Sequence, residues 1–182
     1  MQSIDQLKIV LNPADIPYET WGKSSTKTLQ HLFEEITSGE SALVPDDKHI
    51  IKRQVSVVGI NVFYETSAGD RLKLEESKQV FKNGMARVRT LPCSVSEKMT
   101  DSEKPYDAAI RGLREELSLN GDFSLSYDGQ SVESDVSPSY PGLHSEYVTN
   151  KFTVLLSDEQ YSPDGYIETQ DDKNTHFEWQ CA

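Results

Sequence analysis

The segment LPCSVSEKMTDSEKPYDAAIRGLREELSL occupies residues 91–119 of the 182-residue chain, and the interpretation of the rest depends on it. Its second half has the spacing of a helix, in which residues three and four positions apart are neighbours. Glu115 and Glu116 therefore lie on one side of the helix, three and four residues beyond Gly112. Paired carboxylates suit Mg²⁺ or Mn²⁺, which prefer oxygen ligands. Gly112 stands where a third carboxylate would complete such a set.

Segments typical of β-strands lie on both sides of this helix. QVSVVGINVFYET at 54–66 is rich in β-branched and aromatic residues and is followed by a turn at 67–70. Further strand candidates, in chain order, are 71–77, 79–84, 85–91, 123–129, 146–157 and 176–181. A helix set among strands predicts an α+β domain over residues 51–182.

Residues 1–50 are predicted to form an N-terminal extension with one amphipathic helix. Its apolar stripe, at positions i, i+3, i+4 and i+7, consists of Leu29, Leu32, Phe33 and Ile36. Ser24, Ser25 or Thr26 can cap its start, and Gly39 can end it. We expect this helix to pack on the main domain or on a second copy in a homodimer, and simple core packing is the plainer alternative.

Composition limits the classes of function. A net charge of −12 argues against general nucleic-acid binding. Residues 52–90 nevertheless carry eight Lys and Arg against four acids, which suits a small phosphorylated ligand or, equally, a solvated strand surface. No apolar run reaches the roughly 18–20 residues of a membrane span, and no basic N-terminal region of a secretory signal is present. With two cysteines and no CxxC, the sequence predicts a soluble, cytoplasmic protein.

The segment 91–119 resembles a Nudix box, G-x5-E-x7-R-E-U-x-E-E-x-G-U, where U is aliphatic. The matching residues are Glu103, Arg111, Leu113, Glu115, Glu116 and Leu119, and Leu91-Pro92 resembles the usual LPG opening. The departures are Cys93-Ser94 in place of two glycines, about three extra residues before Glu103, Ser118 for the late glycine, and Gly112 for the glutamate after the arginine. The resemblance covers about 30 residues, and the order of the flanking strands agrees with the Nudix α/β/α sandwich and its mixed sheet.

The resemblance implies a divergent Mg²⁺- or Mn²⁺-dependent hydrolase. Its substrate would be a nucleoside-diphosphate-linked or related compound, cleaved at a pyrophosphate bond. Glu115 and Glu116 would be metal ligands and catalytic residues, and Glu97 is a candidate replacement for the missing ligand. Glu103 and Arg111 would form the ion pair that braces loop against helix. The alternative for the two glutamates is a solvated helix face.

Three further residues are candidates for substrate binding. Arg87 and Arg89 share one strand face and could contact a pyrophosphate through their fixed forks of donors, or could simply serve solubility. Tyr140, near the Pro141-Gly142 turn, could wall a planar ligand or anchor its loop. Two rival functions remain: a catalytically inactive Nudix-fold module that binds a phosphorylated ligand or a protein partner, and a plain interaction domain that dimerises through its N-terminal helix.

Overall fold

The computed structural model describes residues 1–23, 26–46 and 50–182. The chain divides into two compact units, which are described separately. Unit 1 comprises Met1–Val57, Lys98–Glu103 and Ser131–Thr149, and unit 2 comprises Val58–Glu97, Lys104–Gln130 and Asn150–Ala182. Unit 1 thus joins the N-terminal residues to two later segments. A domain boundary at residue 50 stays a prediction.

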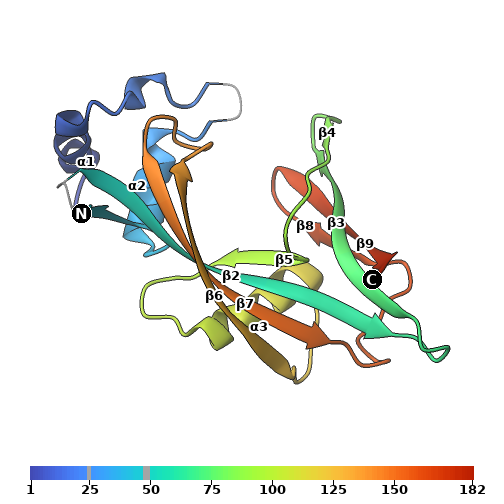
Figure 1. Ribbon diagram of the computed structural model, residues 1–182. Helices are drawn as coiled ribbons and strands as arrows, with labels where there is room; N and C mark the ends of the chain where they lie inside the picture. Colours follow the sequence, from blue (N-terminus) through green and yellow to red (C-terminus); the bar gives the residue numbers. More distant parts are fainter. Residues whose placement is uncertain (24–25, 47–49) are drawn as a thin grey trace. The chain divides into compact units, whose positions relative to one another are not determined.

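Unit 1 begins with two helices that lie side by side in the blue part of Figure 1. Helix α1, Ile4–Leu11, is capped by the Ser3 hydroxyl, and α2, Leu29–Thr37, corresponds to the predicted amphipathic helix. The cap of α2 is Thr28, which exchanges hydrogen bonds with His31 in a capping box. Thr26 instead bonds to the backbone around Lys23, and the other two predicted caps, Ser24 and Ser25, lie outside the described residues. Two short 3₁₀ helices, η1 (Asn12–Ala14) and η2 (Tyr18–Thr20), connect α1 to α2.

The core of unit 1 joins these helices to a distant turn. Its buried members are Leu7, Leu11, Ile16, Trp21, Leu32, Tyr140 and Leu143. The Trp21 indole N–H donates to the Pro141 carbonyl at 2.9 Å, which ties the N-terminal segment to the turn before β7. The N-terminal extension therefore shares one core with a part of the chain more than 100 residues away in sequence.

The strands form one sheet with the order β6-β7-β2-β3-β9-β8. The bounds are β1 Ala42–Pro45, β2 Ile51–Glu65, β3 Arg71–Phe81, β4 Ala86–Arg87, β5 Val95–Lys98, β6 Leu125–Val136, β7 His144–Leu155, β8 Tyr166–Thr169 and β9 Lys173–Cys181. β3 pairs antiparallel with β2 and with β9, and β1 pairs antiparallel with the first residues of β2. The prediction of an α+β protein with a helical N-terminal region is confirmed.

Three strand predictions need correction. The candidates at 71–77 and 79–84 are one strand, β3, with an irregularity between Glu76 and Lys78. The candidate at 85–91 shortens to Ala86–Arg87 because the chain turns at Gly84 and leaves β3 after two paired residues. The short strands β1, β5 and β8 were not predicted. No helix in the described ranges is both long and apolar enough to cross a membrane.

Helix α3, Pro105–Leu117, is the helix predicted in the second half of segment 91–119. Pro105 occupies its first turn, where a missing N–H costs nothing. Lys104 is the N-cap without a side-chain bond, and Glu103 accepts from the Thr100 N–H at 2.9 Å. The buried face carries Leu113 and Leu117, whereas Ile110 is only half-buried. Small residues, Ala108, Ala109 and Gly112, complete that face.

Candidate metal and catalytic site

Gly112 lets a strand approach α3 closely. A Cβ atom at this position would lie 3.1 Å from the Cβ and 3.5 Å from the Cγ of Glu97 in β5, and 3.6 Å from a methyl group of Val95. Figure 1 shows β5 beside the yellow helix. The Glu97 side chain therefore occupies the space that a side chain at position 112 would need. Since Glu116 is one helical turn beyond Gly112, Glu97 comes to the helix face that carries Glu116.

Arg111 connects Glu97 to α3. Its Nη1 lies 3.1 Å from Oε1 of Glu97 and 3.1 Å from Oε2 of Glu115. The second contact joins residues four apart on one helix, and its Glu115 partner is largely exposed. Arg111 thus holds two of the predicted metal ligands. The predicted ion pair between Arg111 and Glu103 stays a prediction, and the structure gives each residue other contacts.

Glu116 is the most perturbed acid of unit 2. Burial, followed by the negative charges of Glu168, Glu97 and Glu76, raises its pKa from 4.5 to about 8. Arg89 alone among the named neighbours lowers it. Glu168 comes from β8, which packs against α3. Four carboxylates from four elements therefore share one region of unit 2, and we call Glu76, Glu97, Glu116 and Glu168 the carboxylate cluster.

The two arginines predicted to meet a pyrophosphate are both engaged by neighbours. Arg89 makes a bidentate pair with Glu76, at 2.7 Å from Nε to Oε1 and 2.6 Å from Nη2 to Oε2. The Glu76 side chain is 2% exposed, whereas that of Arg89 is 43% exposed, so the guanidinium edge stays open to solvent. Arg87 donates twice to Oε1 of Gln79, at 3.2 and 2.5 Å. Their role toward a substrate stays a prediction.

Cys93 and Ser94 replace the two glycines of the resemblance, and both have structural contacts. The buried Ser94 hydroxyl donates to the Leu74 carbonyl at 2.5 Å and accepts from the Val62 N–H at 3.0 Å, so it links β2 to β3. The Cys93 thiol donates to the Val95 carbonyl at 3.2 Å, and burial raises its pKa. Cys93 and Ser94 directly precede β5, whose residues Val95 and Glu97 lie against Gly112 of α3.

The chemistry of the carboxylate cluster fits a hard divalent cation. Its possible donors are all carboxylate oxygens, the type that Mg²⁺ and Mn²⁺ prefer. The half-buried Glu116 carboxyl, with three other acids near it, is destabilised when ionised, and a cation would remove that penalty. Within the described residues, however, no three His, Cys, Asp or Glu side chains already converge with ligand geometry. Two of the four carboxylates are turned toward arginines instead, because Glu97 pairs with Arg111 and Glu76 pairs with Arg89.

Tyr140 lies elsewhere, in unit 1. Its side chain is completely buried in the core with Trp21, at 5.1 Å between ring centroids. Such a ring offers no surface to a planar ligand, and the placement favours the loop-anchor alternative.

Two members of the carboxylate cluster were missed from the sequence. Glu76 sits in a strand among alternating charges, and Glu168 lies in a polar stretch for which no strand was predicted. A weak signal existed for Glu168, because the sequence YIET at 166–169 contains the aromatic and β-branched residues typical of strands.

No protein-family model matches this sequence, and no curated protein matches it. Among solved structures, the chain is similar to several Nudix proteins. The NUDIX domain of Shewanella oneidensis NrtR complexed with ADP ribose is 13% identical, with a TM-score of 0.45, over 82% of each chain. A MutT/nudix family protein from Enterococcus faecalis is 14% identical, with a TM-score of 0.49, over 98% of this chain and 56% of that chain. A C. elegans Ap4A hydrolase binary complex is 13% identical, with a TM-score of 0.40, over 69% of this chain and 78% of that one.

These solved structures carry the same family name as the resemblance of residues 91–119. At such identities and TM-scores the similarity carries no information about substrate or activity. The chemistry proposed below rests on the residues of this chain.

Proposed function

We propose that this chain is a divergent Nudix-type hydrolase that uses Mg²⁺ or Mn²⁺ to cleave a pyrophosphate bond in a nucleoside-diphosphate-linked or related compound. The observation that carries the proposal is the carboxylate cluster, with Glu97 seated against Gly112 and Glu116 strongly destabilised as an anion. Perturbed acids of this kind concentrate at functional sites, because folding alone gives no reason to gather like charges.

In this proposal Glu97 of β5 replaces the metal ligand that is missing at position 112. Glu116 and Glu97 would hold the cation, with Glu168 in reach as a further acid. A bound divalent cation would supply neutralising charge to phosphate oxygens and a polarised water. Arg111 would position Glu97 and Glu115, because its guanidinium already contacts both carboxylates at 3.1 Å.

Arg89 and Arg87 would have different roles in this reaction. Arg89 would hold Glu76 through its bidentate pair while its open edge faces a phosphate. Arg87 is exposed and oriented by Gln79, so we propose that it contributes to substrate affinity more than to the chemical step. Tyr140 has no part in this proposal. A cytoplasmic location and a homodimer stay predictions.

One observation favours the inactive-module alternative. Glu115, a metal ligand by resemblance, is paired with Arg111 and largely exposed, and the acid next to Arg111 is absent. A chain that binds a phosphorylated ligand without turnover would tolerate both features.

Hydrolysis assays separate the two functions. Purified protein is incubated with a panel of dinucleotide and nucleotide-sugar diphosphates, together with Ap4A and ADP-ribose, in the presence of Mg²⁺ or Mn²⁺. We expect turnover that requires the metal and that falls about 100-fold or more in Glu116→Gln and in Glu97→Gln. Glu133→Gln, an exposed acid of β6, is the matched control and should keep full activity. Absence of turnover on every compound, with ligand binding that EDTA leaves unchanged, would establish the inactive module instead.

A further inference from the structure

A row of polar side chains crosses the sheet of unit 2 and ends in the carboxylate cluster. Strand by strand, it consists of Arg87 in β4, Gln79 in β3, Thr175 in β9 and Glu168 in β8, each directly opposite the next. Strands β8 and β9 lie side by side in the red part of Figure 1. Because directly opposed residues point to the same face of a sheet, the whole row shares the face that carries Glu168.

One member of this row differs from the others in its hydrogen bonds. Arg87 donates to Oε1 of Gln79, and Glu168 accepts from the side-chain amide of Gln170 at 2.5 Å. Thr175 is only 2% exposed, and its hydroxyl makes no hydrogen bond within the described residues. A buried hydroxyl without a partner lowers stability and is unusual in a folded protein. Thr175 therefore offers an unused hydrogen-bond donor next to an acid of the carboxylate cluster.

The Glu168 carboxylate is within reach of this hydroxyl. The Cβ atoms of directly opposed residues lie about 4.5–5.5 Å apart, and rotation about side-chain bonds can bring a hydroxyl and a carboxylate together across that separation. Glu168 instead bonds to Gln170, which is exposed and follows the end of β8. Glu168 thus has two alternative partners, one exposed and one buried.

The buried partner lies toward the rest of the carboxylate cluster. Strand β9 lies between β8 and β3, and β3 carries Glu76. Helix α3 packs against β8, and the charge of Glu168 raises the pKa of Glu116. A Glu168 carboxylate that turns from Gln170 to Thr175 therefore moves from the end of β8 toward the middle of the sheet.

We propose that Thr175 is a positioning residue of the carboxylate cluster: its hydroxyl donates a hydrogen bond to Glu168 when that carboxylate turns from Gln170 toward a bound divalent cation. This inference rests on the proposed metal site and adds to it a residue that does not touch the cation. Without a cation, the negative charges of the other acids favour the outward position of Glu168. A cation offsets this repulsion, and the hydroxyl gains the partner that it lacks.

Thr175→Val tests the hydroxyl, because valine has nearly the shape of threonine and no donor. We expect a calorimetric Mg²⁺ titration at pH 8 to give an affinity about tenfold weaker than that of wild type, since a hydrogen bond to a carboxylate is lost. In EDTA the same variant should melt about 2–4 °C higher than wild type, because an unpaired buried hydroxyl has been removed. A packing defect would lower both quantities, so the opposite signs identify the positioning role.

Three further variants serve as controls. Thr175→Ser keeps the hydroxyl and should bind Mg²⁺ within about twofold of wild type. Thr169→Val makes the same substitution at an exposed position of β8 on the opposite face and should change neither quantity. Gln170→Leu removes the outward partner of Glu168 and should strengthen Mg²⁺ binding.

The outcomes separate this inference from the metal site on which it rests. Equal Mg²⁺ affinities of wild type and Thr175→Val would overturn the inference and leave the metal site in place. Weaker affinity with a lower melting temperature in EDTA would also overturn it, because the hydroxyl would then have a structural role. Absence of Mg²⁺ binding by wild type would refute the metal site itself, and the inference with it.

Discussion

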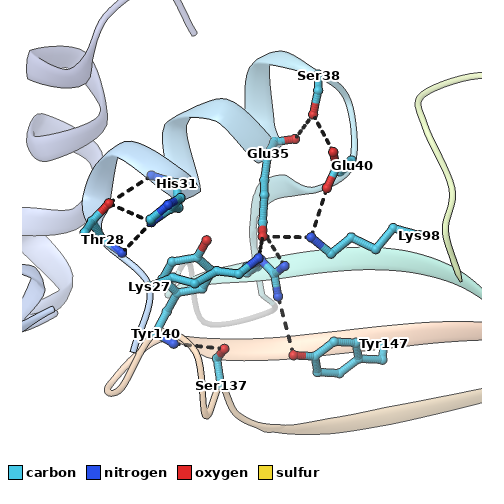
Figure 2. Close-up of polar contacts among 11 residues, drawn as sticks. Lys27, Thr28, His31, Glu35, Ser38, Glu40, Lys98, Ser137, Tyr140 and Tyr147 are labelled. Carbon is cyan, nitrogen blue, oxygen red and sulfur yellow. Dashed lines mark hydrogen bonds and ion pairs between the residues drawn. The ribbon is translucent and has the colours of Figure 1, made fainter. Parts of the chain in front are cut away.

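Glu35, which is buried, and Glu116, which is half-buried, have opposite surroundings. Glu35 in unit 1 meets three cations: Lys27 at 2.6 Å, Arg53 at 2.6 Å and Lys98 at 2.7 Å. Figure 2 shows Lys27 and Lys98 at the Glu35 carboxylate. Burial raises its pKa, but these hydrogen bonds and charges outweigh burial and lower the pKa from 4.5 to about 2. Glu116 in unit 2 meets three acids, and its pKa rises to about 8.

The contrast separates a structural cluster around Glu35 from the cluster that we propose as a metal site around Glu116. Charges around Glu35 are neutralised by partners within the chain, so that cluster is complete without a ligand. The negative charges around Glu116 reinforce one another, and among the neighbours that shift its pKa most, Arg89 alone opposes them. This arrangement lowers stability unless a cation neutralises it, which is consistent with the metal site that we propose.

The largest expected effect is the loss of Glu35. Glu35→Ala leaves Arg53, only 3% exposed, without its carboxylate, and we expect a loss of about 3–5 kcal/mol in the free energy of unfolding. Urea unfolding measures it. Glu34→Ala, on the exposed side of α2, should cost less than about 0.5 kcal/mol. A loss below about 1 kcal/mol in Glu35→Ala would show that the ionic cluster does not stabilise unit 1.

The pH dependence of stability tests whether Glu35 stabilises unit 1 as an ionised carboxylate. A carboxyl whose pKa is lowered in the folded state contributes stability above its unfolded pKa, and this contribution disappears as pH falls through the folded value. The stability difference between wild type and Glu35→Gln should therefore be constant above about pH 4.5 and shrink toward pH 2. A difference independent of pH in this window would contradict the assigned ionisation.

Glu116→Gln should raise the free energy of unfolding at high pH, whereas the Glu35 variants should lower it. The unfolded carboxyl ionises near pH 4.5 and the folded one near pH 8, so the unfolded state binds fewer protons between these values. Wild-type stability in EDTA should therefore fall as pH rises through this window. Each unit of pKa shift corresponds to about 1.4 kcal/mol, and we expect Glu116→Gln to be about 2–4 kcal/mol more stable at pH 8. Equal stability of both proteins at pH 8 would mean that Glu116 is not strained as an anion.

Gly112→Ala tests the contact between β5 and α3. Alanine favours the helix by about 1 kcal/mol, but its Cβ would press on the Glu97 side chain at 3.1 Å. We expect a net change in stability within about 1 kcal/mol, together with weaker Mg²⁺ binding because Glu97 is displaced. Unchanged Mg²⁺ affinity would exclude Glu97 as the replacement ligand.

Ser118→Gly should give the smallest change. Ser118 ends α3 with φ of 53°, in the left-handed region where glycine is favoured. The substitution restores the late glycine of the Nudix pattern and should raise the free energy of unfolding by about 0.5 kcal/mol, with no effect on Mg²⁺ binding. Destabilisation would show that the Ser118 side chain has a role of its own.

The elements that could be predicted are those with local signals. β2 and α2 have clear periodicity, and Pro105 marks the start of α3, so each was predicted near its observed place. Glu97 was predicted as a replacement ligand from its position alone, and the structure puts it against Gly112. Whether it binds metal is untested.

The partners of the two glutamates could not be predicted. Arg53 and Lys98 reach Glu35 from segments 18 and 63 residues away, and Glu168 approaches α3 only because β8 pairs with β9. No local pattern encodes such contacts, since they depend on how the strands are ordered in the sheet. The same holds for Tyr140, whose burial follows from the N-terminal helices that cover its turn.

We propose that the carboxylate cluster around Glu116 is a divalent-cation site. Its most direct test is a calorimetric Mg²⁺ titration at pH 8 and at pH 5.5, with wild type and Glu116→Gln. We expect saturable Mg²⁺ binding by wild type that is at least about tenfold tighter at pH 8 than at pH 5.5, because the cation competes with the proton on Glu116. The variant should show no such pH dependence. Absence of Mg²⁺ and Mn²⁺ binding at pH 8, or identical binding by Glu116→Gln, would contradict it.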